Sequence, residues 1–415
     1  MDRRTKCVFL LILAISLAMA SSPLDAVAKG NADFSRDFFK EVALSNQGNI
    51  ISSPFSLLAA LAMVHTGAKG KSNSLIAQGL HLPEKKEDAL EGLRQLMEKL
   101  RNVEKVELSI ANKIFVKAGF DLVPDYISAL EKTFNVTAEN VNFLEAAAAS
   151  TINDWVKVQT KEKIQNIVKS SDFDSLTRMV LVNAIYFKGP WLKPFIKSST
   201  QDRPFYSDET NSIEVPFMYQ KSYFEYAKLD DLEAQLLILP YTGKELSMAI
   251  ILPDKRTGLP ELEKKLATAD LGEILQKAHN KEVEVYLPKF KIETTLDLQG
   301  VLSKMGLGHM FTNDADLSGI SESEPLQVSK VLQKAFIEVS EEGTEAAAAT
   351  ALKFLKGCAK PPPRRRPIIF KADHPFIFNL IQTSKKCRQY PMTLFSGHLL
   401  KMLKASNAKK AKYER

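Results

Sequence analysis

Residues 341–350 constrain the fold of this chain more than any other segment of its sequence. They read Glu-Glu-Gly-Thr-Glu-Ala-Ala-Ala-Ala-Thr. The four alanines carry no side chain able to act as an acid, a base, a nucleophile or a ligand. What they offer is small volume, because protein interiors are close-packed and large side chains would clash in a filled layer. The segment is therefore suited to slide into an existing layer of the fold.

Four alanines after a glutamate also favour a helix. The same string stands at residues 145–150, where Ile152, Trp155 and Val156 follow at helical spacing, so we expect a helix there. No such apolar stripe follows residues 345–350, and the chain runs instead into Gly357 and a series of prolines. The helix propensity of residues 345–350 thus conflicts with the sequence around them, and such a conflict is typical of a functional site.

The chain directly downstream has the composition of an exposed loop. Residues 355–360 read Leu-Lys-Gly-Cys-Ala-Lys, and residues 361–367 read Pro-Pro-Pro-Arg-Arg-Arg-Pro. Such a stretch is a poor helix or central strand. A small-residue segment joined to a protease-accessible loop indicates a chain that is cut and then inserts into its own sheet.

Periodicity predicts helices early in the chain and strands late in it, which is the α+β class. The expected helices are residues 31–44, a helix from Pro54 through Met63 with Ser53 as its N-cap and Gly67 as its stop, and residues 86–101. The expected strands are residues 236–240 and 246–252, joined as a hairpin at Thr242-Gly243, and the alternating residues 282–287.

Further motifs accompany residues 341–350 along the chain. They are Asn-Ile-Ile-Ser-Ser-Pro-Phe-Ser at 49–56, Leu-Val-Asn-Ala-Ile-Tyr-Phe-Lys-Gly-Pro-Trp at 181–191, Asp-Leu-Ser-Gly-Ile at 316–320, the segment 329–336, Asp-His-Pro-Phe at 373–376 and Leu-Phe-Ser-Gly at 394–397. In this order they resemble the serpin family of serine protease inhibitors, of the arthropod type. The resemblance covers nearly the whole mature chain and implies three β-sheets, eight or nine helices and an exposed reactive-centre loop at about residues 341–367.

The resemblance also assigns structural roles to individual residues. Gly343 is the flexible pivot of the inhibitory hinge and Thr344 is the first inserting side chain. Asn49, Ser53 and Ser56 match the shutter, where the sheet opens, and Trp191 matches the breach below the hinge. Gln333 stands where the family usually has a shutter histidine, so a titratable group is absent at that position. The full hinge consists of Glu342, Gly343, Thr344, Glu345, Ala346, Ala347, Ala348 and Ala349.

The implied mechanism is suicide inhibition, in which a serine protease attacks the loop and is trapped as a 1:1 covalent acyl-enzyme. Family spacing from the hinge points to the Gly357–Cys358 bond, and a shift by one residue gives Lys356–Gly357 or Cys358–Ala359. Lys356 implies a trypsin-like target, which we favour, whereas Gly357 implies an elastase-like one. Residues 364–366, all arginine, lie too far along the loop for trapping and form a substrate site, an exosite or a solvated loop.

The resemblance implies a monomer with no catalytic residue, no cofactor and no metal site. The sequence holds no nucleophile-elbow, zinc-protease, P-loop or dinucleotide motif, and its six histidines are scattered. Two other interpretations stay open. One is a non-inhibitory serpin that acts as a binding protein or as a protease substrate, and the other is a hydrolase whose triad is assembled from distant residues.

The N-terminus predicts secretion. Residues 1–20 combine Arg3 and Arg4, an apolar run and Ala18-Met19-Ala20, which together form a signal peptide. We expect residues 21–403 to form a single serpin domain and residues 404–415 a solvated basic tail, with no nucleic-acid or membrane partner. Asn135-Val136-Thr137 is a glycosylation sequon. Cys358 and Cys387 remain after cleavage of the signal peptide, and we expect free thiols.

Overall fold

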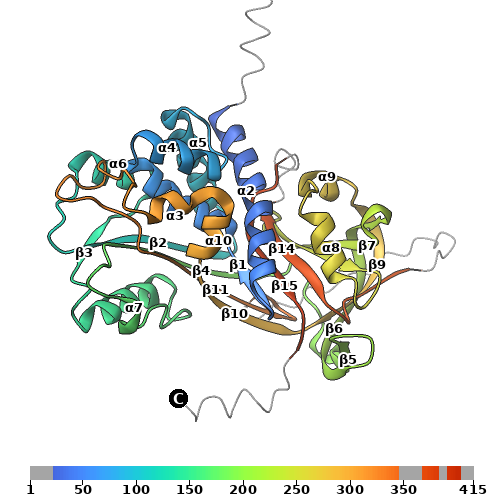
Figure 1. Ribbon diagram of the computed structural model, residues 1–415. Helices are drawn as coiled ribbons and strands as arrows, with labels where there is room; N and C mark the ends of the chain where they lie inside the picture. The colour runs from blue at the N-terminus through green and yellow to red at the C-terminus, as the bar shows by residue number, and fades with distance from the viewer. Residues whose placement is uncertain (1–21, 345–366, 383–389, 403–415) are drawn as a thin grey trace, which may run out of the picture.

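The computed structural model describes residues 22–344, 367–382 and 390–402 (Figure 1). The proposed signal peptide, the reactive-bond residues Lys356, Gly357, Cys358 and Ala359, the thiol of Cys387 and the basic tail lie outside these ranges. The same holds for the hinge residues Glu345, Ala346, Ala347, Ala348 and Ala349.

The described chain contains nine α-helices and fifteen strands. The helices are α2 (Pro23–Ser45), α3 (Pro54–Gly67), α4 (Gly70–Gly79), α5 (Lys86–Arg101), α6 (Pro124–Phe134), α7 (Ala147–Gln159), α8 (Leu259–Leu266), α9 (Leu271–Gln276) and α10 (Gln299–Leu302). The first seven strands are β1 (Ile50–Ser52), β2 (Glu107–Lys117), β3 (Glu139–Val141), β4 (Met179–Pro190), β5 (Gln201–Tyr206), β6 (Ser212–Leu229) and β7 (Ala234–Pro240). The others are β8 (Leu246–Pro253), β9 (His279–Pro288), β10 (Phe290–Asp297), β11 (Lys330–Ser340), β12 (Gly343–Thr344), β13 (Ile368–Lys371), β14 (Phe376–Gln382) and β15 (Thr393–Leu399).

The helices expected from the sequence are confirmed. α5 spans the expected residues 86–101, α2 contains residues 31–44, and the alanine string at 145–150 opens α7. α3 begins at Pro54, and the hydroxyl of Ser53 accepts a hydrogen bond from the Ser56 amide at 3.3 Å. That bond satisfies one of the backbone donors that a helix leaves free at its N-terminus.

Six strands form the sheet that carries the hinge, in the order β10-β11-β12-β4-β2-β3. The side chains of β4 alternate between two hydrophobic cores, because successive residues of a strand point to opposite faces. Leu181 and Ile185 join the large core that contains α2 and α3, whereas Val180 and Val182 join a second core with α7. Figure 1 shows α7 on the face of this sheet opposite to α3. The centre of the sheet is thus buried on both sides.

The other sheet has nine strands, in the order β1-β15-β14-β8-β7-β6-β9-β13, with β5 paired to β6. It contains two of the three sheets expected, because the continuous strand β6 belongs to both. The first part of β6 pairs with β5 and its last part pairs with β7. The predicted hairpin of β7 and β8 is confirmed, and Val283, Val285 and Leu287 of β9 are buried in the predicted alternation.

No helix in residues 22–344, 367–382 or 390–402 is long and apolar enough to cross a membrane.

Candidate functional site

The hinge begins inside the six-stranded sheet. Gly343 and Thr344 form β12, which pairs antiparallel with the end of β4 and antiparallel with the end of β11. Gly343 lies opposite Pro190, and the Ser340 hydroxyl donates a hydrogen bond to the Gly343 carbonyl oxygen at 3.1 Å. A two-residue wedge therefore already separates β4 from β11 at this end of the sheet.

Gly343 stands where no other residue fits without rearrangement. Its φ of +144° is a conformation that residues with a Cβ rarely adopt. A Cβ at this position would lie 2.1 Å from the Gly189 carbonyl oxygen and 2.6 Å from the Pro190 Cα. The backbone of the hinge thus approaches β4 more closely than a side chain allows.

Thr344 is fully buried among aromatic side chains. Its hydroxyl lies 2.7 Å from the Tyr241 hydroxyl. The Tyr241 ring stacks on the Trp191 ring with a centroid separation of 4.4 Å, and the Trp191 indole nitrogen donates to the Ser340 carbonyl oxygen at 3.0 Å. Trp191, expected at the breach, thus lies directly beneath the turn that leads into the hinge.

The turn that precedes β12 is fixed by two glutamates. The carboxylate of Glu341 lies 2.8 Å from the ammonium of Lys289 and accepts a hydrogen bond from the Thr200 hydroxyl at 2.8 Å. Burial raises the pKa of Glu341, but the hydrogen bonds from Lys289 and Thr200 outweigh it, and the pKa is lowered overall. The carboxylate of Glu342 pairs with Lys197 at 2.6 Å. Both carboxylates therefore hold the start of the hinge against the body of the protein.

Beyond this wedge the sheet is closed. β4 and β11 pair directly and in parallel, from Val180 opposite Lys330 to Tyr186 opposite Phe336. The neighbouring pairs β10–β11 and β2–β4 are antiparallel. The centre of the sheet therefore contains one parallel seam between antiparallel strands.

Gln333 forms a buried hydrogen-bonded bridge across this seam to the start of α3. Its amide oxygen accepts from the Ser53 backbone amide at 2.9 Å, and its amide nitrogen donates to the Ser53 carbonyl oxygen at 2.9 Å. The same nitrogen donates to the Asn183 side-chain oxygen of β4 at 2.6 Å. The Ser53 hydroxyl donates to the Leu394 carbonyl oxygen at 2.5 Å. An uncharged amide thus fulfils both donor and acceptor roles at the predicted shutter position.

Two asparagines complete this network, and the sequence did not single them out as site residues. Asn183 donates to the Ser56 hydroxyl and to the Asn112 side-chain oxygen. Asn112, on β2, donates to the Ser56 carbonyl oxygen at 3.2 Å. We call Ser53, Ser56, Asn112, Asn183 and Gln333 the shutter network. It ties α3 to β2, β4 and β11, so β4 and β11 cannot separate without breaking it.

Asn49 does not join the shutter network, although it stands close to Ser53 in the sequence. Its side-chain oxygen accepts from the backbone amides of Leu400 and Lys401 at 2.8 and 3.0 Å, and its amide nitrogen donates to the Lys401 carbonyl oxygen at 2.7 Å. Asn49 therefore fixes the chain that leaves β15. Strand β1 lies between Asn49 and Ser53 in the chain, so the two side chains contact different parts of the fold.

Two histidines with carboxylate neighbours, His374 and His398, are not arranged as general bases. In His374, one ring nitrogen lies 2.9 Å from the Asp373 carboxylate and the other lies 2.8 Å from the Pro253 carbonyl oxygen. In His398, the Glu263 carboxylate and the Gly48 carbonyl oxygen occupy the two nitrogens in the same way. A triad histidine needs one nitrogen facing a nucleophile. Neither ring offers that nitrogen, and no cluster of metal-binding side chains occurs in the part of the chain that the structure describes.

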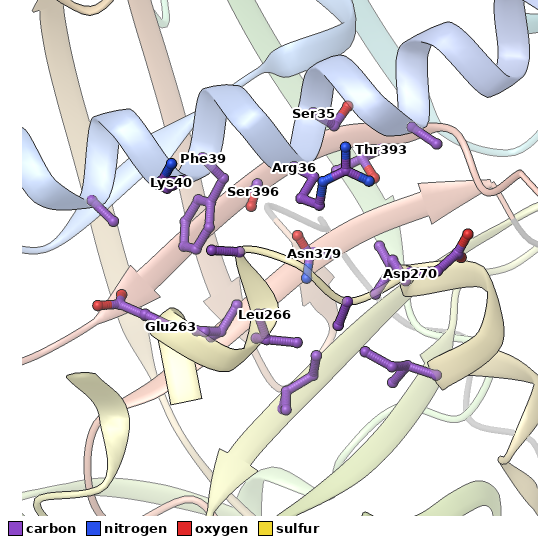
Figure 2. A pocket seen from close by; sticks show the side chains of 18 of the residues that line it. Ser35, Arg36, Phe39, Lys40, Glu263, Leu266, Asp270, Asn379, Thr393 and Ser396 are labelled. Carbon is purple, nitrogen blue, oxygen red and sulfur yellow. The ribbon is translucent and has the colours of Figure 1, made fainter. Parts of the chain in front are cut away.

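A separate cavity of about 400 Å³ lies between α2, the α8–α9 segment and strands β14 and β15 (Figure 2). Phe39 and Leu266 contribute apolar surface, and Arg36, Asn379 and Asp270 contribute polar groups. Ser35 also lines it, is 6% exposed and has no hydrogen-bond partner for its hydroxyl among the described residues. The cavity therefore offers an apolar space with an unused polar group at its wall.

Comparison with known proteins agrees with this arrangement. The sequence profile described as Serpin (serine protease inhibitor) matches residues 29–401. The chain is 38% identical over 369 residues to the leukocyte elastase inhibitor of Sus scrofa, which covers 86% of this chain and 95% of that protein. It is 37% identical over 379 residues to antichymotrypsin-2 of Bombyx mori, covering 90% and 97%.

Solved structures show the same fold. Serpin48 of the insect Tenebrio molitor superimposes with a TM-score of 0.82 at 36% identity, covering 91% of this chain and 99% of that structure. Human thyroxine-binding globulin, solved in complex with thyroxine, gives a TM-score of 0.82 at 27% identity, covering 92% and 100%. The relatives named for an activity are inhibitors of proteases and not enzymes, apart from this globulin, which is named for the hormone it binds. The chain belongs to the serpin family of serine protease inhibitors.

Proposed function

We propose that the chain is a secreted, suicide-type inhibitor of serine proteases that traps its target by loop cleavage and strand insertion. The observation that carries the proposal is β12, the two-residue wedge of Gly343 and Thr344 between β4 and β11. A strand that continued in the direction of β12 would run down the parallel seam, antiparallel to both neighbours. The hinge thus stands at the entrance of the path that an inserting strand would take.

Strand insertion would improve the hydrogen bonding of this sheet. It would replace the single parallel ladder between β4 and β11 by two antiparallel ladders. Antiparallel pairing is slightly more stable per residue than parallel pairing, and each added ladder contributes further backbone hydrogen bonds. The uncleaved state is therefore the less stable arrangement of this sheet, and the difference supplies the driving force.

The sequence of the hinge fits the inserted position. Side chains alternate along a strand, so with Thr344 buried, an inserted strand would turn Glu345 outward and Ala346 inward. Inward-facing side chains of the inserted strand would pack beneath the helices that cover the sheet, and small side chains fit there without clashes. The shutter network must open for the strand to pass, because Gln333 and Asn183 join the two strands that separate.

The covalent step follows the chemistry of serine proteases. The protease serine oxygen attacks the carbonyl carbon of the loop residue, the peptide bond to the next residue breaks, and the new amine leaves with the proton from the serine. An ester then links the protease to the loop, and insertion carries the protease away before water hydrolyses it. We place the broken bond at Gly357–Cys358, with Lys356–Gly357 and Cys358–Ala359 as neighbouring alternatives, and favour a trypsin-like target over an elastase-like one.

The test combines the mature protein with trypsin and separately with an elastase, followed by denaturing gels. The proposal predicts a 1:1 adduct that survives denaturant, and a released C-terminal peptide that begins at Gly357, Cys358 or Ala359. Cleavage at the arginines of residues 364–366 without any adduct would contradict inhibition and favour a protease substrate.

A ligand-carrying role is the second candidate function, and the cavity between α2, α8 and β14 favours it. Its apolar walls and the unpartnered Ser35 hydroxyl suit a small, largely apolar molecule with one hydrogen-bonding group. The similarity to thyroxine-binding globulin, a serpin named for a small ligand, agrees with such a role. Calorimetric titration with iodinated and non-iodinated aromatic acids tests it. Ala267 lines the cavity. Binding abolished by the cavity-filling variant Ala267→Trp would support the role, and no heat from any such ligand would contradict it.

A further inference from the structure

The geometry points to Asn135 as an N-glycosylation site whose first sugars cover a cleft that leads to the shutter network. This inference rests on the proposed secretion of the chain and not on protease inhibition. The cleft lies where the end of α6 meets α5, α7 and β2.

Asn135 is presented at the surface by the end of α6. It is the C-cap residue, with a left-handed backbone at φ 58° and ψ 43°, and its amide donates to the Glu131 carbonyl oxygen at 3.0 Å. Asparagine tolerates the left-handed region better than other residues with a Cβ. The side chains of Asn135 and Thr137 are both exposed. The folded protein therefore leaves room for a glycan on the sequon.

Asn135 also lines the cleft. Two adjoining hollows of about 440 and 220 Å³ share Asn112, Asn135, Val136, Trp155 and Gln159. Asn135 and Gln159 are exposed and stand at the rim, whereas Asn112 is 4% exposed and forms the floor. Asn112 donates to the Ser56 carbonyl oxygen and so belongs to the shutter network. The cleft therefore connects the glycan attachment point with the residues that hold the sheet closed.

The chemistry of the cleft suits a carbohydrate. The Trp155 ring is half-buried on the cleft wall, and an aromatic face packs against the apolar face of a sugar ring. Glu131 and Gln159, both exposed, offer polar groups to the sugar hydroxyls. Lys113 lies with its ammonium 5.3 Å from the Trp155 ring centroid, which fixes the ring from one side. A covalently tethered sugar needs little further affinity to remain in the cleft, because the tether keeps its local concentration high.

Attachment of the glycan to Asn135 needs one co-substrate, an oligosaccharide linked to a lipid diphosphate. The Asn135 amide nitrogen forms a bond to the anomeric carbon of the first sugar, and the bond from that carbon to the diphosphate oxygen breaks. The lipid diphosphate leaves, and the amide nitrogen gives up one proton. No oxidant or reductant takes part.

The variants that test the site change Thr137 and leave the left-handed Asn135 intact. Thr137→Ala destroys the sequon, whereas Thr137→Ser preserves it and serves as the matched control. Each protein is produced in insect cells and collected from the medium. Intact mass and treatment with a peptide N-glycosidase should show a glycan on the parent and on Thr137→Ser, and its loss from Thr137→Ala. Secreted parent protein without a glycan would overturn the inference and leave the proposed secretion standing.

Tryptophan fluorescence tests whether the sugars cover the cleft. The chain has two tryptophans, and Trp191 is 2% exposed, so collisional quenching by acrylamide reports chiefly on Trp155. We expect a larger quenching constant for Thr137→Ala than for Thr137→Ser, and the difference should vanish when Trp155→Phe is added to both. Equal quenching of the two proteins with the glycan present on one would show that the glycan points away from the cleft, which would overturn that part of the inference.

Discussion

The hydroxyl of Tyr241 lies 2.7 Å from the hydroxyl of Thr344, and both side chains are fully buried. Burial raises the pKa of Tyr241 far above its ordinary value, although the hydrogen bond with Thr344 acts in the opposite direction. The phenol therefore stays neutral at any physiological pH. Thr344, which we propose is the first side chain to insert, is thus held by a neutral partner on the body of the protein.

Replacing Thr344 by arginine should convert the inhibitor into a substrate. Insertion would have to bury an unpaired guanidinium, which is strongly unfavourable. About 1.4 kcal/mol added to the insertion barrier slows insertion tenfold and lets deacylation compete. We expect the number of inhibitor molecules consumed per protease trapped to rise for Thr344→Arg, because a tenfold slower insertion raises the ratio of deacylation to insertion about tenfold. Thr344→Ser, which keeps the hydroxyl facing Tyr241, is the control. An unchanged stoichiometry for Thr344→Arg would contradict the claim that the buried position of Thr344 limits insertion.

Gly343→Ala should release the wedge from the sheet. The new Cβ would meet the Gly189 carbonyl oxygen at 2.1 Å in a backbone conformation of φ +144°. Strain of this kind costs about 1–3 kcal/mol. We expect a lower melting temperature and faster proteolysis of the chain beside residue 343. Gly300→Ala in α10 is the matched control, because a Cβ there meets no atom within 4 Å. Equal melting temperatures for the two variants would contradict the close approach.

Gln333→Leu should destabilise the closed sheet more than a glutamine-to-leucine substitution at an exposed position. The substitution leaves the backbone amide and carbonyl of Ser53 and the side chain of Asn183 without their buried partner. Each buried group left unpaired costs about 1–3 kcal/mol. Denaturant unfolding should show this loss, and incubation at raised temperature should show faster self-association. Gln276→Leu on the exposed end of α9 should change neither property.

Stability should fall as the pH drops from about 6.5 to about 4 because of His65. Burial, together with the charge of Lys86, lowers the pKa of His65 to about 4. The unfolded chain has a histidine pKa of about 6.5, so within this window it binds more protons than the folded chain. The free energy of unfolding therefore rises with pH through the window and has its full value above about pH 6.5. The slope approaches about 1 kcal/mol per pH unit.

Denaturant unfolding across this pH range checks the role of His65. The variant His65→Gln retains an amide donor toward Asn73, whose side-chain oxygen lies 3.0 Å from the histidine nitrogen. The variant should show a shallower slope between pH 4 and 6.5 than the parent. Identical slopes would assign the acid sensitivity to other groups, such as the paired carboxylates.

Local signals in the sequence predicted local structure well. Ser53 before Pro54 marked the start of α3, because an N-cap and a proline at the first helical position act within one turn. The alternation of buried and partly exposed side chains in β9 could be predicted for the same reason, since it depends only on neighbouring residues. Composition and resemblance pointed to Gly343 and Thr344 as hinge residues, and the structure places both in strand β12.

Contacts between residues far apart in the sequence could not be predicted from the sequence. Ser56 contacts Asn112 and Asn183, which stand 56 and 127 residues away in sequence. Asn183 lies in the motif at 181–191, but nothing near either asparagine in the chain indicates a contact with Ser56. Glu341 pairs with Lys289 and Thr200 only because the turn before β12 returns to the end of the nine-stranded sheet. Asn49 is close to Ser53 in sequence, but its side chain contacts the chain that leaves β15 and not the shutter network.

The most direct test of suicide inhibition is mass analysis of the mixture of mature protein and trypsin after denaturation. Suicide inhibition predicts a species whose mass equals one protease plus the N-terminal part of the chain, joined through the protease serine to Lys356, Gly357 or Cys358, together with the complementary released peptide. A mixture that contains cleaved chain and free active trypsin, with no such species for any chymotrypsin- or subtilisin-class protease tried, would contradict it.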